Sequence, residues 1–120
     1  VLAEQDEVPL LVFDEIDANV GGEVAVSVGR HMGQIASTHQ VLCITHLPQV
    51  AAHAGAHFAV QKDVRGGKTF TTLTPLSDAD RIDELARMLG GVSKSSQEHA
   101  RELINLARQP SSPKKAAKAK

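Results

Sequence analysis

Aromatic side chains and cysteines are scarce in this chain of 120 residues, which has three Phe, one Cys and neither Trp nor Tyr. The core must therefore be aliphatic, and a hydrophobic content of 42% is sufficient for one domain. The lone Cys43 cannot form an intrachain disulfide, which fits a cytosolic setting. No apolar run approaches the roughly 18 residues that a membrane helix needs. No signal-peptide pattern opens the sequence.

Charge is unevenly distributed along the chain, although the net charge is only −1. Residues 111–120 contain four Lys and no acid, so residues 1–110 have 9 basic and 14 acidic residues and a net charge of −5. Because this Lys-rich end has no large apolar residue, residues 110–120 are predicted to form a disordered basic tail. Such a tail is usually a solvated terminus, but a basic tail can also neutralise nucleic-acid phosphates.

Two short apolar runs, residues 10–13 and 41–45, predict strands connected by a helix. The helix is expected to begin near residue 23, and its predicted apolar face consists of Val24, Val28, Met32 and Ile35. Gly29 and Gly33 weaken this helix and are expected to permit close packing against a sheet. This order and spacing predict parallel strands joined by a right-handed crossover.

The second half of the chain predicts a hairpin followed by two helices. Two β-type runs, residues 57–64 and 68–76, flank a Gly66-Gly67 turn signal. Ser77 or Asp78 is expected to cap the first helix, which ends at a Gly-Gly pair and has an apolar stripe of Ile82, Leu85, Ala86 and Leu89. Ser95 or Ser96 is expected to cap the last helix, whose stripe is Ala100, Leu103, Ile104 and Ala107.

Acidic and histidine side chains follow the two predicted parallel strands. Asp14 and Glu15 come directly after the first strand, and His46 follows the second. In open α/β sheets, ligands bind at the carboxyl ends of the strands, so these three side chains are expected to converge. An Asp in this place suits Mg²⁺, which prefers oxygen ligands and keeps several waters. Glu15 could orient or deprotonate a water that attacks a phosphate, and His46 could hydrogen-bond a terminal phosphate.

Simpler explanations exist for each of these residues. An acid after a strand is often a helix cap or part of a solvated loop, and for Asp17 capping explains the sequence as well as function does. The apolar run before Asp14 and Glu15, with His46 at the end of the other strand, favours a functional site. A two-metal nuclease is disfavoured, because adjacent side chains on a strand diverge. The other histidines, His31, His39, His53, His57 and His99, have no metal-ligand spacing and are interpreted as ordinary surface or packing residues.

Four stretches of the sequence resemble the ATPase heads of the SMC-like group. LLVFDE (residues 10–15) resembles a Walker B strand with its catalytic Glu, and IDANVGG (residues 16–22) resembles a D-loop. ITHLPQVAAHA (residues 44–54) resembles the switch region that carries the His of the H-loop. Together with RIDELARMLGG (residues 81–91), these motifs resemble the RecN family of bacterial DNA repair proteins over about residues 8–107.

The resemblance implies an α/β fold, the C-terminal lobe of a P-loop ABC-type ATPase head. Parallel strands with crossover helices would be followed by a β-hairpin and two C-terminal helices. ATP and Mg²⁺ would be the cofactors. Asp14 would help to hold Mg²⁺ through water, Glu15 would polarise the attacking water, Asp17 would belong to the D-loop at the dimer interface, and His46 would contact the γ-phosphate.

The resemblance also implies partners for the intact protein. It would hydrolyse ATP between the heads of a homodimer and associate with DNA in double-strand break repair and recombination. Its expected location is the bacterial cytoplasm, in association with the nucleoid.

One departure from the family pattern concerns the phosphate-binding loop. The chain has no G-x-x-x-x-G-K-[ST] and no LSGG-like stretch, and it does not begin with Met. We therefore expect residues 1–109 to be the C-terminal part of a head whose Walker A half lies elsewhere, and the chain alone to be inactive as an ATPase. The alternative hypothesis is a noncatalytic dimerisation or interaction module from a truncated or split head.

Overall fold

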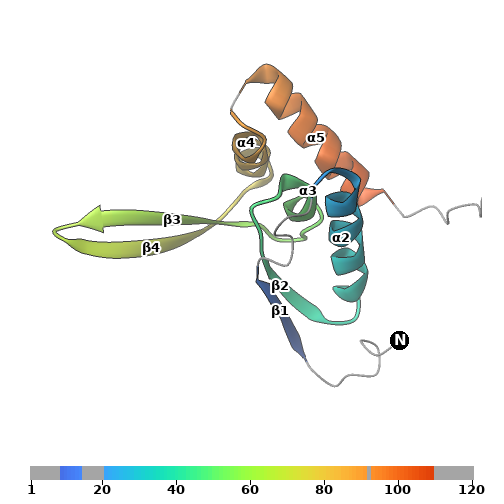
Figure 1. The fold of residues 1–120 in the computed structure, drawn as a ribbon, viewed down its shortest axis with the longest axis horizontal. Coiled ribbons are helices and arrows are strands. Elements are labelled where there is room, and N and C mark those ends of the chain that lie inside the picture. Colours follow the sequence, from blue (N-terminus) through green and yellow to red (C-terminus); the bar gives the residue numbers. More distant parts are fainter. Residues whose placement is uncertain (1–8, 15–20, 92, 110–120) are drawn as a thin grey trace, which may run out of the picture.

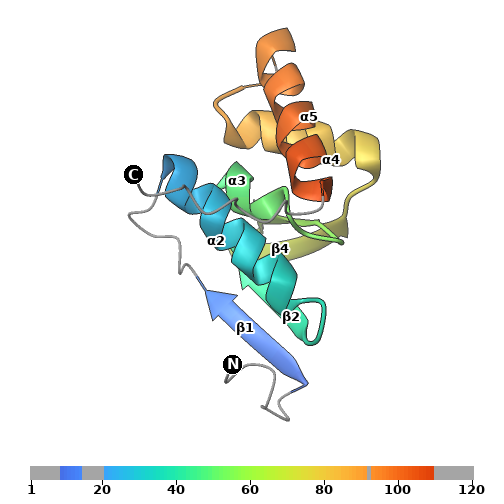
Figure 2. The same cartoon turned by 90° about the vertical axis from the view of Figure 1, so that its right-hand side faces the viewer.

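The computed structural model describes residues 9–14, 21–91 and 93–109. A parallel pair of strands lies beside the helix α2, the helices α4 and α5 pack together, and a hairpin projects away from the helices (Figures 1 and 2). In chain order the elements are β1 (Leu10–Asp14), α2 (Gly22–Ile35), β2 (Gln40–Ile44), α3 (Pro48–Ala51), β3 (Phe58–Arg65), β4 (Lys68–Pro75), α4 (Asp78–Met88) and α5 (Lys94–Arg108). This mixed α/β order agrees with the predicted fold class.

The predicted parallel strands are confirmed. β1 and β2 form a two-stranded parallel sheet in which Asp14 pairs with Ile44, and α2 connects them. Alternate residues of both strands are exposed on one face of this sheet, and we call it the open face. Parallel sheets are usually covered on both faces, so the open face has the character of a contact surface. Its exposed apolar side chains are Leu10, Val12, Leu42 and Ile44.

The buried side of α2 agrees only in part with the predicted one, because Met32 is buried and Val28 and Ile35 are half-buried. Val24 is 59% exposed, whereas Ala25, Gly29 and Met32 are buried. Two of these buried residues, Ala25 and Gly29, are small, and α2 packs closely against α3 at Gly29. A Cβ at Gly29 would lie 2.5 Å from Nδ1 of His53. The close approach that Gly29 allows is therefore to α3 rather than to the sheet.

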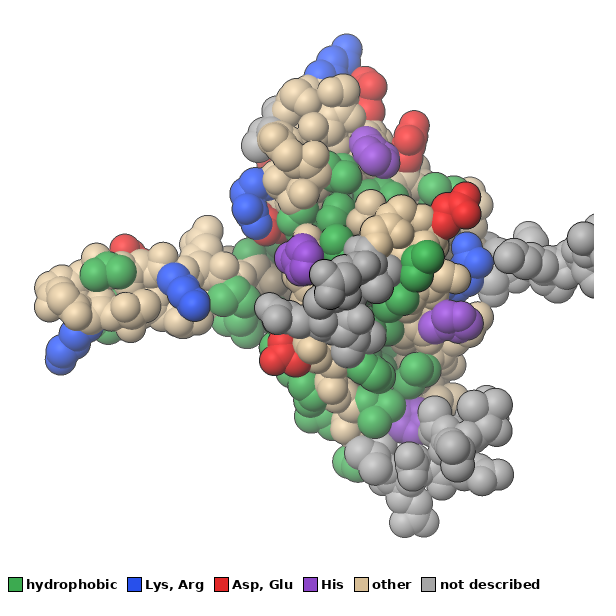
Figure 3. Space-filling view, viewed as in Figure 1, with side chains coloured by type: hydrophobic (Ala, Val, Ile, Leu, Met, Phe, Trp, Pro, Cys, Tyr) green, Lys and Arg blue, Asp and Glu red, His purple; other side chains and the backbone are tan. Residues whose placement is uncertain are grey.

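β3 and β4 form the predicted antiparallel hairpin. Gly66 and Gly67 have φ values of 56° and 77°, as the two central residues of a type I′ turn require. The hairpin is exposed along almost its whole length, and Val64 is 69% exposed. The register puts Phe58, Val60, Val64 and Leu73 on one face of the hairpin. Figure 3 shows hydrophobic side chains at the surface of this projection and over the region of β1 and β2.

The principal core lies between α3, α4 and α5. It agrees with the predicted stripes of the last two helices, whose partly buried Ile82, Leu89 and Ala107 pack at its margin. Leu85 is the largest side chain that is fully buried in the described part of the chain. The buried members of the core are Ala51, Ala52, Leu85, Ala86, Ala100, Leu103 and Ile104.

Local signals determine where the last two helices begin and end. Ser77 caps α4, as predicted, and accepts a hydrogen bond from the Asp80 amide at 3.2 Å. At the other end, the Gly91 amide donates to the Ala86 carbonyl and the Gly90 amide to Arg87, which is a Schellman motif. Gly90 has a φ of 116°, a value that favours glycine.

The predicted cap of α5 was wrong. Ser93 caps this helix by accepting from the Ser96 amide at 3.2 Å, so α5 begins before Ser95. Ser93, Ser95 and Ser96 are all close enough to the start of the helix to supply the capping hydroxyl, and the first of them does so here. The predicted basic tail, residues 110–120, lies outside the described residues.

The two glycines of α2 offer a matched test of the packing. Gly29→Ala should lower the free energy of unfolding by about 1–2 kcal/mol, because its Cβ would also lie 3.0 Å from the Gln49 carbonyl oxygen. Gly33→Ala meets no atom within 4 Å, so its higher helix propensity should raise stability by up to about 1 kcal/mol. Urea unfolding of both variants measures the difference. A Gly29→Ala variant as stable as Gly33→Ala would contradict the close packing of α2 on α3.

Candidate functional site

The candidate site lies at the carboxyl edge of the parallel sheet. Asp14 is the last residue of β1 and pairs with Ile44, the last residue of β2. Thr45 and His46 follow Ile44 directly, so Asp14 and His46 belong to the same edge of the sheet. Both side chains are exposed. This is the type of edge at which open α/β sheets bind ligands.

The segment that carries His46 is held from both sides. The Leu47 amide donates to Oγ1 of Thr45 at 3.0 Å, and the Ala51 amide donates to the Leu47 carbonyl at 3.1 Å. Pro48 occupies the first turn of α3, where a backbone N–H would have no partner within the helix, so the lack of an N–H costs no hydrogen bond. His46 therefore lies in a two-residue turn between the end of β2 and the N-cap Leu47.

Two predicted site residues, Glu15 and Asp17, lie outside the described residues. Their roles remain predictions, as does the convergence of Glu15 with Asp14 and His46. The site as described consists of one carboxylate and one imidazole at a common sheet edge.

This donor set is compatible with Mg²⁺ but not with an all-protein metal cage. Among the described residues, no group of three or more His, Cys, Asp or Glu side chains could hold a metal ion. Mg²⁺ is commonly bound through one or two carboxylates, with waters and substrate phosphates as the other ligands. Asp14 is the described residue that fits this role, because its carboxylate is exposed at the sheet edge.

Two of the other histidines make local contacts. Nδ1 of His39 lies 2.9 Å from Oγ1 of Thr38, and Nδ1 of His53 donates to the Gln49 carbonyl at 2.9 Å. His57 is half-buried. These contacts agree with a packing role for His53.

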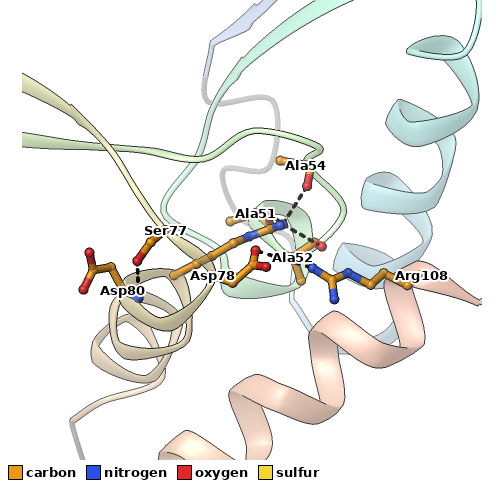
Figure 4. A network of polar contacts seen from close by, with 8 residues as sticks. Ala51, Ala52, Ala54, Ser77, Asp78, Asp80 and Arg108 are labelled. Atoms are coloured by element: carbon orange, nitrogen blue, oxygen red, sulfur yellow. Dashed lines mark hydrogen bonds and ion pairs between the residues drawn. The ribbon is translucent and has the colours of Figure 1, made fainter.

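Sequence reasoning missed a buried arginine on α4. Arg81 is only 6% exposed, and its Nη2 donates to the carbonyl oxygens of Ala51, Ala52 and Ala54 at 3.1, 3.0 and 2.7 Å (Figure 4). The signal was present in the sequence, because Arg81 lies four residues before Leu85 and thus falls within the apolar stripe of α4. A charged residue at such a position is unusual and requires polar partners.

Burial and nearby charge change the protonation of the groups around Arg81. Burial lowers the pKa of Arg81, and the positive charge of Arg108 lowers it further, whereas Asp78 raises it. The pKa of His57 is also lowered, first by burial and then by Arg81, with an opposing effect of Glu84. A hydrogen bond from Arg87 lowers the pKa of Glu84. The half-buried imidazole of His57 is therefore favoured in its neutral form.

The fold is that of an ATPase head. A solved structure from work on ATP-driven dimerization and DNA-stimulated activation of SMC ATPases superposes with a TM-score of 0.57. It covers 73% of this chain and 52% of that chain at 20% identity. The described elements thus have the fold of a lobe of an SMC-like, ABC-type ATPase head. No protein-family model matches the chain.

Sequence similarity identifies the family within this class. DNA repair protein RecN of Mycobacterium tuberculosis is 52% identical over 99 residues, which is 81% of this chain and 16% of that protein. RecN of Deinococcus radiodurans is 44% identical over 82% of this chain, and RecN of Bacillus subtilis is 39% identical over 91%. Over the aligned segment, the chain belongs to the RecN family. It spans 16% to 19% of the length of these three relatives.

Within the described residues, no helix combines the length and the apolar character needed to cross a membrane.

The burial of His57 makes the free energy of unfolding depend on pH. Unfolding restores its pKa to the ordinary value of about 6.5, so the unfolded chain binds the proton more readily than the folded chain. The stability that depends on neutral His57 is therefore present above that value and decreases as the pH falls below it. His57→Gln should reduce the loss of unfolding free energy between pH 8 and pH 5.5 relative to the unsubstituted chain.

Urea unfolding at several pH values measures this difference, and the control is His99→Gln, which removes an exposed histidine. If His57→Gln and His99→Gln change the pH-dependence equally, burial of His57 does not contribute to it.

Proposed function

We propose that this chain supplies the Walker B, D-loop and H-loop part of an ATP-hydrolysing, SMC-like head that acts in DNA repair. The observation that supports the proposal most strongly is the parallel register of β1 and β2. In that register Asp14 ends one strand and Thr45-His46 follow the other. Because this segment belongs to the RecN family, the ligand expected at this edge of the sheet is a nucleotide.

Each residue has a distinct role in the proposed reaction. Mg²⁺ and ATP, when bound, supply a charge-neutralised γ-phosphoryl group. Asp14 would help to hold Mg²⁺ through water, and Glu15 would orient the attacking water and accept its proton. His46 donates a hydrogen bond to a γ-phosphate oxygen. Asp17 would belong to the D-loop at the dimer interface.

The phosphate cradle must come from another segment, because most phosphate contacts in such heads are made by a G-x-x-x-x-G-K-[ST] loop. The open face of the parallel sheet and its exposed Val12 and Leu42 suit contact with that segment. We use the term completed head for a protein that unites this chain with a segment carrying the loop.

The proposed biological setting follows from the relatives. The RecN relatives are DNA repair proteins by name, and the similar SMC ATPase structure is described in terms of dimerization driven by ATP and activation by DNA. By extension, the completed head would form a head-to-head homodimer around ATP. It would associate with DNA in repair and recombination, in the cytoplasm at the nucleoid.

A second candidate function is a noncatalytic interaction module. The exposed apolar face of the hairpin, with Val60, Val64 and Leu73, favours it because such a face is suited to binding a partner. In that case the chain would contribute to assembly without contributing to hydrolysis.

Glu15→Gln tests the proposed water-activating residue. In the completed head this variant should bind ATP but hydrolyse it at least about 100-fold more slowly, because it cannot accept the proton of the attacking water. It should also accumulate as a nucleotide-bound dimer. Steady-state turnover, nucleotide binding and size-exclusion chromatography measure these three properties. Glu23→Gln, an exposed acid on α2, is the matched control. Normal turnover in the Glu15 variant would remove this residue from its role.

Mixing experiments distinguish the two candidate functions. This chain and a separate polypeptide carrying the phosphate-binding loop should associate and together hydrolyse ATP, whereas neither does so alone. A variant of the chain with Leu42→Asp on the open face should lose association, because the contact would bury an unpaired charge. Association without hydrolysis would support the interaction module instead.

A further inference from the structure

The interaction that joins α4 to α3 also bears on the position of His46. α3 is a helix of four residues, Pro48–Ala51, and a single turn is not stable by itself. Its position must therefore be determined by what it contacts. It contacts α2 at Gly29, it contributes Ala51 to the principal core, and its C-terminal carbonyl groups face Arg81.

Arg81 satisfies the open end of α3. The last carbonyl groups of a helix have no partner within the helix, and they carry the negative end of its dipole. Nη2 of Arg81 lies within hydrogen-bonding distance of the carbonyl oxygens of Ala51, Ala52 and Ala54. Within the described part of the chain, the hydrogen bonds of the Arg81 side chain all go to this backbone segment, so the guanidinium holds α3 in place (Figure 4).

Only a few residues separate the end of α3 that Arg81 contacts from His46 in the candidate site. Leu47 is the N-cap of α3, and His46 precedes it directly. The amides of Val50 and Ala51 both donate to the Leu47 carbonyl at 3.1 Å, so a displacement of α3 also displaces Leu47. On its other side, His46 is separated from β2 only by Thr45.

We propose that Arg81 is a positioning residue for His46. By holding the C-terminal end of α3 against α4, it orients the turn that presents His46 at the sheet edge. The C-terminal helices are thereby coupled to the nucleotide site. This inference rests on the proposed role of His46 in contacting the γ-phosphate.

Three arginine variants of the completed head test the coupling. Arg81→Met keeps the length of the side chain but removes its donors, and it should lower kcat about tenfold with less than a twofold change in KM for ATP. Arg81→Lys should lose less activity, because an ammonium group can still donate to the same carbonyl oxygens. Arg87→Met is the matched control, because Arg87 lies on the same helix and donates to Glu84 at the surface.

A double-mutant cycle with His46→Ala separates positioning from a general loss of stability. If Arg81 acts through His46, Arg81→Met should change kcat less than twofold in the His46→Ala background. Additive losses in the double variant would overturn the proposal and leave the proposed function intact. A His46→Ala variant with normal turnover would instead contradict the role of His46.

Amide hydrogen exchange in the same proteins provides a readout that does not depend on activity. Arg81→Met should accelerate the exchange of the amides of Leu47, Val50, Ala51 and Ala52, which are all hydrogen-bonded in this structure. If Arg81→Met does not fold, Arg81→Lys is the deciding variant and should show a smaller acceleration at the same amides. Unchanged exchange at these positions in the folded variants would overturn the proposal, whatever the ATPase activity.

Discussion

A buried guanidinium, whose hydrogen-bond partners among the described residues are backbone carbonyl groups, connects the helical layer to the strands. Arg81 donates hydrogen bonds to the carbonyl oxygens at the end of α3. The segment that contains His46 connects β2 to this one-turn helix. Burying a cation is unfavourable unless polar groups replace its water, so the three carbonyl groups and the guanidinium depend on one another. The small core beside them also depends on the position of α3, because Ala51 and Ala52 contact the core around Leu85 only while α3 lies against α4.

In the proposed function, the architecture explains how a short segment can carry several functional groups. Parallel pairing brings the carboxyl ends of β1 and β2 together, and helices on one side fix the turn after β2. The open face, with Val12 and Leu42, and the apolar face of the hairpin then remain for contacts with other segments. In the proposed function these contacts add the phosphate-binding loop, so that acids and imidazole from this chain meet a nucleotide held largely by another.

Features with a strong local or periodic signal were predicted correctly from the sequence. The parallel strands, the Gly66-Gly67 hairpin and the apolar stripe around Leu85 are of this kind, and Asp14 and His46 share a sheet edge as the strand order requires. The wrong cap of α5 came from a choice among neighbouring serines, and the other differences come from tertiary contacts. Val24 is exposed because α2 turns Ala25 and Gly29 toward α3. Periodicity puts Arg81 in the apolar stripe of α4, but only the fold shows the backbone carbonyl groups that let it be buried there. The orientation of Glu15 and Asp17 remains a prediction.

The structure of the completed head with Mg²⁺ and a nonhydrolysable ATP analogue tests the central claim most directly. The decisive measurement is the position of His46 relative to the terminal phosphate. The account predicts that an imidazole nitrogen of His46 lies about 3 Å from a γ-phosphate oxygen, with Asp14 on the same side of the sheet edge and bound to a water of the metal. A His46 side chain directed away from the nucleotide, on the opposite side from Asp14, would contradict the assignment of this edge as an ATPase site.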